Sequence, residues 1–62
     1  MTSDEYREIR QRMGLTQEQL ARELGVTSMT VSRRERGETE IDGEATHALK
    51  RLWERHVVGS VN

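Results

Sequence analysis

The chain has 62 residues, 32% of them hydrophobic and 34% charged, and a formal net charge of −1. A chain of this length makes one domain, and it buries only about 60% of the surface that its unfolded form exposes, which leaves too little core for an enclosed catalytic pocket. The sequence contains no cysteine, so disulfides and thiolate metal sites are excluded.

The first pattern predicts a helix that begins after Thr2. Glu5 follows Thr2 at the spacing of a capping box, in which each residue satisfies a backbone N–H of the other. Apolar side chains then recur three and four residues apart, on one helical face: Tyr6, Ile9 and Met13. Gly14 supplies the stop, since glycine readily adopts the left-handed conformation that follows a helix.

A second helix is expected to start at Thr16, where Gln19 again stands at the capping-box spacing. Its inner face has three apolar side chains: Leu20, Ala21 and Leu24. Gly25 ends this helix, and only two residues separate it from the next helical stretch. The pattern therefore predicts two short helices joined by a turn that begins with glycine.

The third helix is expected over residues 28–36, with Thr27 as its N-cap and Gly37 as its stop. At about 100° per residue, its inner side has three side chains: Thr30, Val31 and Arg34. The outer side is rich in hydrogen-bond donors: Ser28, Met29, Ser32, Arg33 and Arg36. Arginine can pair with guanine, serine can bond several base edges, and methionine can contact a thymine methyl. This outer side predicts a surface that recognises bases.

A polar connection over residues 38–41 leads to a fourth helix, and Ile41 is expected to turn inward. Asp42 is a suitable N-cap. Residues at core spacing follow it: Ala45, Ala48, Leu49, Leu52, Trp53 and His56 or Val57. Trp53 and Val57 exceed what a small helical core needs, so we expect them to cover a dimer contact.

Charge is unevenly distributed along the chain. Residues 27–37 carry three arginines and one glutamate, whereas residues 38–46 carry four acids and no base. The acidic run is most simply a solvated loop with acids at a helix start. It could also suppress non-specific DNA binding or contact a basic partner.

The stretch from Leu15 to Thr27 (LTQEQLARELGVT), followed by Thr-Val-Ser at 30–32 and Glu-Arg-Gly at 35–37, resembles the phage-repressor and Cro type of helix-turn-helix domain, the XRE family. The resemblance covers roughly residues 6–52. It implies an all-α, lambda-repressor-like fold: a compact bundle of four short helices, or five where relatives divide the last. From the helical pattern we expect one domain over residues 1–58, followed by a frayed tail over residues 59–62.

The resemblance implies a role for individual residues. Six would contact base edges: Gln17, which would also touch the phosphate backbone, Thr27, Ser28, Met29, Ser32 and Arg33. Thr16 and Arg36 would contact the DNA backbone. Arg10 would pair with Glu35 behind the third helix, as a clamp rather than a DNA contact. The sequence departs from the family pattern at Arg34, where relatives often have an apolar residue, and in the acids that follow Gly37.

We therefore expect a transcriptional regulator, a repressor in the first instance, that binds a double-stranded DNA operator as a homodimer, at least on DNA. In such domains the second helix of the motif, here the one expected over residues 28–36, lies in the major groove. Phage repressors are the standard example of this docking mode. The alternative is an antitoxin or anti-repressor type of module that binds a protein partner through the same helices.

Other functions have little support in the sequence. An enzyme is not expected, because no nucleophile has a nearby base and no glycine loop could cradle phosphate. Neither a cofactor nor a metal is expected, since His47 and His56 lack a third ligand at useful spacing. No apolar run approaches the ~20 residues that span a bilayer, and the first residues do not resemble a signal peptide. We expect a cytoplasmic chain.

Overall fold

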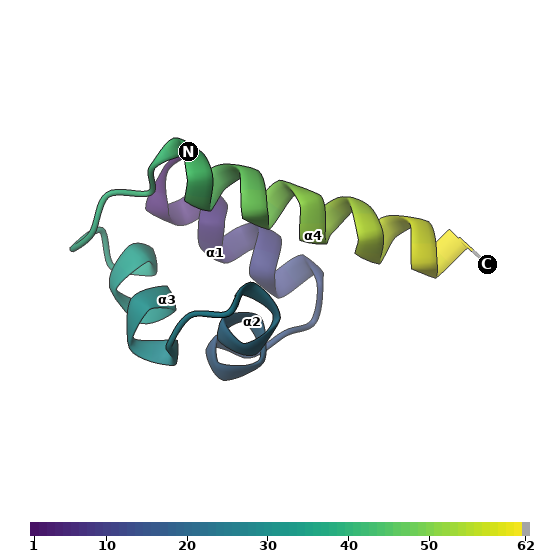
Figure 1. Cartoon of the computed structure of the whole chain (residues 1–62), viewed down its shortest axis with the longest axis horizontal. Coiled ribbons are helices and arrows are strands. Elements are labelled where there is room, and N and C mark those ends of the chain that lie inside the picture. The colour runs from purple at the N-terminus through teal and green to yellow at the C-terminus, as the bar shows by residue number, and fades with distance from the viewer. Residues whose placement is uncertain (62) are drawn as a thin grey trace.

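The computed structural model of the chain describes residues 1–61, with side chains for residues 1–58. Four helices follow one another: α1 (Ser3–Arg12), α2 (Gln17–Leu24), α3 (Ser28–Glu35) and α4 (Gly43–Val61) (Figure 1). No strand occurs within residues 1–61, so the predicted all-α fold is confirmed. The last helix is one long element, so the five-helix alternative does not apply to residues 1–61.

The expected caps fix where the helices begin. Thr2 Oγ1 accepts from the N–H of Glu5 at 3.1 Å, and Glu5 Oε1 accepts from the N–H of Thr2 at 2.9 Å. The N–H of Thr2 and its hydroxyl together lower the pKa of Glu5. Asp42 Oδ1 caps α4 by accepting from the N–H of Ala45 at 2.8 Å. These local bonds satisfy N–H groups that a helix start otherwise leaves without partners.

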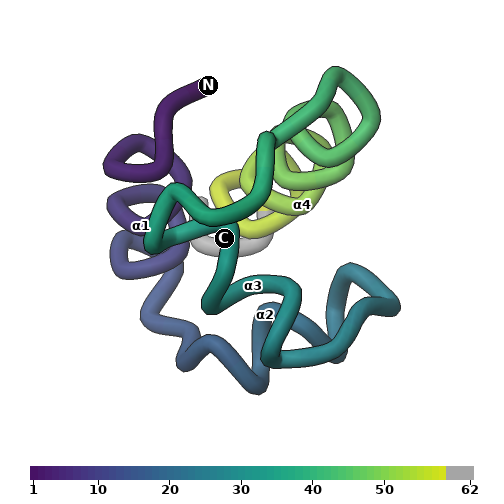
Figure 2. Tube along the Cα trace, turned by 90° about the vertical axis from the view of Figure 1, so that its left-hand side faces the viewer, coloured from purple at the N-terminus to yellow at the C-terminus, as the bar shows by residue number. Residues whose placement is uncertain are grey.

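The core draws on every helix. Four side chains are completely enclosed: Tyr6, Leu20, Val31 and Leu49. Four more hydrophobic side chains are buried: Met13, Ala21, Ala45 and Leu52. Ile41 packs against the core cluster from the connection between α3 and α4, as its sequence position predicts. Seen along the length of the molecule, α1 and α4 lie above the α2–α3 pair (Figure 2).

The C-terminal part of α4 extends past the other helices (Figure 1). The molecule measures 37 × 20 × 18 Å along its principal axes. The buried residues of α4 end at Leu52, whereas Val58 is 68% exposed. α4 continues to Val61, although we expected a frayed tail from residue 59; Asn62, the last residue of that tail, lies outside the described residues. Within residues 1–61, no helix combines the length and apolarity that a membrane span requires.

Candidate nucleic-acid interface

The turn between α2 and α3 sets how the two helices meet. Gly25 has a φ of 72°, in the left-handed region, and the N–H of Val26 bonds the carbonyl of Ala21 at 3.0 Å. A residue with a side chain is strained at such a φ, so glycine is needed where α2 ends. Thr27 then caps α3, with its Oγ1 accepting from the N–H of Thr30 at 3.2 Å. The chain thus passes from the end of α2 to the start of α3 within three residues, Gly25 to Thr27.

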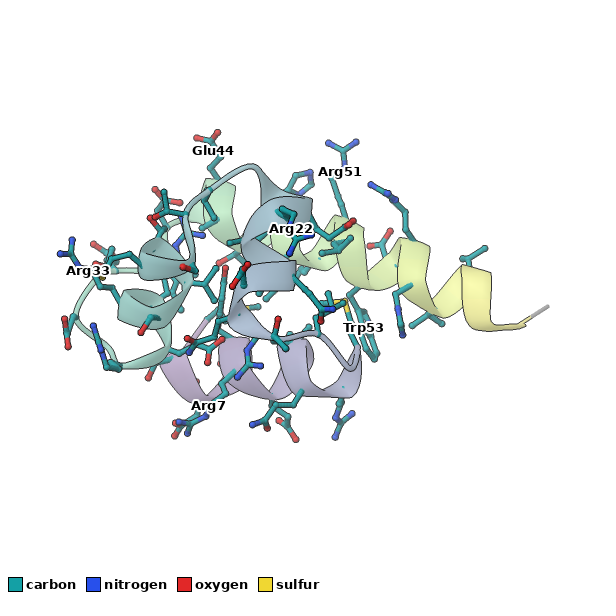
Figure 3. All side chains as sticks on the ribbon, turned by 90° about the horizontal axis from the view of Figure 1, so that it is seen from below. Arg7, Arg22, Arg33, Glu44, Arg51 and Trp53 are labelled. Atoms are coloured by element: carbon teal, nitrogen blue, oxygen red, sulfur yellow. The ribbon has the colours of Figure 1, made fainter. Side chains whose placement is uncertain are left out.

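One side of α3 faces solvent. We call it the outer face of α3, and it consists of five residues: Thr27, Ser28, Met29, Ser32 and Arg33. All are exposed except Ser32, which is half-buried, and Met29 is 56% exposed. Arg33 points away from the body of the molecule (Figure 3). Val31, on the opposite side, is fully buried. The helical periodicity thus separates the two sides as expected, and base contacts by the outer face stay a prediction.

Behind α3, the structure brings Arg10 and Glu35 together. Glu35 accepts two hydrogen bonds from the guanidinium, 2.6 Å from Nε and 3.0 Å from NH2. Arg10 NH1 also donates to the carbonyl of Leu15 at 2.8 Å. The two side chains are only 13% and 3% exposed. This parallel pair of bonds is the strongest geometry for a guanidinium and a carboxylate, and it ties α3 to α1.

Gln17, the first residue of α2, belongs to the same cluster. Its Nε2 donates to Glu35 Oε1 at 3.2 Å, and its side chain is half-buried. The predicted DNA contact therefore concerns a side chain that already holds α2 against α3. We use the name clamp for the three residues Arg10, Gln17 and Glu35. The sequence did not indicate that Gln17 joins the pair.

The two predicted DNA-backbone contacts differ in their surroundings. Thr16 is exposed at the start of α2, where its Oγ1 accepts from the N–H of Gln19 at 3.0 Å. Arg36 is exposed at the end of α3, and its Nε lies 2.9 Å from Glu38 Oε2. Glu38 was not among the predicted site residues. Its carboxylate nevertheless forms an ion pair with Arg36, a predicted DNA contact.

Arg34 lies on the inner side of α3, as predicted, although it is charged. Its NH1 donates to the hydroxyl of Tyr6 at 3.2 Å, and its guanidinium carbon lies 5.9 Å from the centre of that ring. Its Nε is buried and makes no hydrogen bond within the described chain. A cation above an aromatic face is attracted to it, so the contact with Tyr6 accommodates the charge of Arg34 on the inner side of α3.

The two candidate dimer residues lie where α4 leaves the bundle. Trp53 is half-buried, packs against the core cluster and stacks on His56 with ring centroids 6.2 Å apart. In Figure 3 it lies just below the ribbon of α4, near the part that extends past the other helices. Val57 is one turn further on and is 37% exposed. Trp53 therefore serves the core as well as any dimer contact.

Among the described side chains, no group of three His, Cys, Asp or Glu could hold a metal ion. The acidic residues of the connection between α3 and α4 are exposed.

α2 and α3 are two capped helices joined by a turn at Gly25, and α3 has one side buried and a donor-rich side exposed. This arrangement defines a helix-turn-helix DNA-binding domain. A family model described as Helix-turn-helix matches residues 7–45, well over half of the chain. The chain belongs to this family, in its XRE type, and is a DNA-binding regulator of that type. The family is regulatory rather than typically enzymatic. None of the curated proteins and none of the solved structures matches the chain.

Proposed function

We propose that the protein is a sequence-specific regulator, in the first instance a repressor, that inserts α3 into the major groove of an operator. The observation that carries this proposal is the outer face of α3, which is exposed and rich in donors. The major groove presents a distinct donor and acceptor pattern for each base pair, so side chains of this kind can distinguish sequences. Thr16 is exposed at the start of α2 and Arg36 at the end of α3. Both would position α3 by contacting phosphates.

Selection of bound duplexes from a random pool tests this proposal. A recovered consensus of a few base pairs, repeated as two half-sites, is the expected result. A footprint on the promoter of the protein's own gene would add support for a repressor. If the pool yields no enriched sequence and the purified protein binds no duplex, the proposal is wrong.

Arg33→Ala is expected to weaken binding to the selected operator by about 1–3 kcal/mol and to relax the preference at one base pair. Arg33 is exposed on the outer face of α3. Arg51→Ala is the matched control, because it removes the same charge from an exposed position on α4. Titration of both variants against the operator and against single-base variants of it measures the two effects. Equal losses in the two variants would contradict the assignment of Arg33.

We propose further that the protein binds its operator as a homodimer. A single α3 reads only a short half-site, and two-fold pairing spaces two such helices by about 34 Å, one turn of DNA. The support is the extension of α4 beyond the bundle (Figure 1) and the partial exposure of Val57 on it. A second copy would cover this part of α4 next to Trp53.

Val57→Glu is expected to shift the protein toward monomer and to weaken operator binding, because the introduced charge would lie in the contact. Val58→Glu places the same charge on the next residue, which is 68% exposed, and is expected to have the smaller effect. Sedimentation velocity at micromolar concentration, with and without operator duplex, measures the change. A wild-type protein that stays monomeric on its operator would contradict the dimer.

A second candidate function is a protein-interaction module of the antitoxin or anti-repressor type. It is favoured by the exposed acids between α3 and the first turn of α4: Glu38, Glu40, Asp42 and Glu44. Such a surface suits a basic partner rather than phosphates. Co-purification with the product of an adjacent reading frame, lost on neutralising these acids, would support this candidate over a purely DNA-binding one.

A further inference from the structure

Glu38 is held in place by backbone hydrogen bonds just after the C-terminal end of α3. Gly37 has a φ of +75°, which ends the helix and turns the chain toward the carbonyl groups of its last turn. The N–H of Glu38 then bonds the carbonyl of Arg33 at 2.9 Å, and that of Gly37 bonds the carbonyl of Arg34 at 3.3 Å. These two bonds make up a Schellman motif. The backbone of Glu38 is therefore fixed relative to α3.

From this position the carboxylate of Glu38 engages the guanidinium of Arg36 with both oxygens. Oε2 lies 2.9 Å from Nε, and Oε1 lies 3.4 Å from NH2. Nε and one terminal nitrogen form one of the edges with which arginine binds a phosphate bidentately. The carboxylate thus occupies donors that the proposed DNA-backbone contact could otherwise use.

Helix stability does not explain an acid at this position. A negative charge near the C-terminal end of a helix is disfavoured by the helix dipole. The ion pair is also exposed, with the side chains of Arg36 and Glu38 54% and 55% accessible, and exposed pairs contribute only about 0–1 kcal/mol. What the pair changes is the charge presented at this end of α3, which falls from +1 to zero.

We propose that Glu38 is a negative determinant of DNA affinity, which acts by occupying Arg36 in place of a phosphate. The proposal rests on the proposed DNA-binding function and deepens it. A phosphate must displace the carboxylate from this edge of Arg36 or share the guanidinium with it, so the contact yields less free energy and neutralises less of the DNA charge. The protein therefore binds all duplexes more weakly, and with a weaker salt dependence, than its set of arginines would allow.

The test compares Glu38→Gln with wild type on a random-sequence 20-base-pair duplex over a range of salt concentrations. Glu38→Gln is expected to tighten binding about two- to fivefold at low salt, the range that an exposed ion pair can supply. The plot of log affinity against log salt should become steeper by about 0.9, the value for one additional neutralised phosphate. In an Arg36→Gln background, Glu38→Gln should lose most of this effect.

Glu40→Gln is the matched control, because Glu40 is an exposed acid in the same connection and its replacement changes the net charge equally. Equal gains from Glu38→Gln and Glu40→Gln would overturn the proposal in favour of general repulsion, as would an undiminished gain in the Arg36→Gln background or no gain at all. A different outcome, in which neither the wild type nor any variant binds a duplex, would overturn the proposed function itself.

Discussion

Glu35→Ala is expected to destabilise the protein by about 3–5 kcal/mol, the cost of leaving a buried charge without its partner. The substitution removes the acceptor for Arg10, whose side chain is only 13% exposed, and for the amide of Gln17. A chain of this length has a total stability of roughly 3–9 kcal/mol at about 0.05–0.15 kcal/mol per residue. Urea denaturation followed by circular dichroism should therefore find the variant largely unfolded or close to it.

Two further variants test whether the unpaired buried charge causes the loss of stability in Glu35→Ala. Glu18→Ala removes an exposed glutamate that lies 3.5 Å from Arg22 on α2, and it should cost less than about 0.5 kcal/mol. Replacing both members of the buried pair, Arg10→Met with Glu35→Leu, should recover much of the lost stability, because apolar replacements of buried pairs are often tolerated. A Glu35→Ala variant as stable as Glu18→Ala would show that the clamp does not hold the fold together.

We expect the clamp to matter for the proposed DNA binding as well, because it joins α3 to both preceding helices through hydrogen bonds. Arg10 reaches Glu35 from α1 and Gln17 reaches it from α2. The double replacement would keep the fold but lose these bonds, so it provides a folded protein in which to ask whether α3 must be held rigidly. Weaker operator binding by that variant would show that the clamp orients the outer face of α3.

Much of the fold could be predicted from the sequence because its signals are local. A capping box needs only two residues three apart, and Thr2 with Glu5 forms one in the structure. The inner and outer sides of α3 follow from a step of 100° per residue, and Val31 is fully buried as expected. In each case the residues that decide the structure are neighbours along the chain.

The contacts that the sequence did not predict join residues that different parts of the fold bring together. Gln17 meets Glu35 across 18 positions, and Arg34 meets Tyr6 across 28. The end of α4 has another cause: we expected a frayed tail over residues 59–62, and residues 59–61 are Gly-Ser-Val, weak helix formers. They continue α4 to Val61 because adding one residue to a long helix costs far less than starting one.

Tyr6→Ala is expected to cost about 3–5 kcal/mol, the range for losing a large buried aromatic side chain. Tyr6 is fully buried, and its hydroxyl and ring both contact Arg34. Tyr6→Phe keeps the ring and loses only the hydrogen bond, so it should cost about 0.5–1.5 kcal/mol and lower the melting temperature by roughly 4–8 °C per kcal/mol. Thermal unfolding of both variants measures the difference. Were Tyr6→Phe as damaging as Tyr6→Ala, the hydroxyl rather than the ring would be what holds Arg34 inside, since Arg34 Nε has no partner of its own in the described chain.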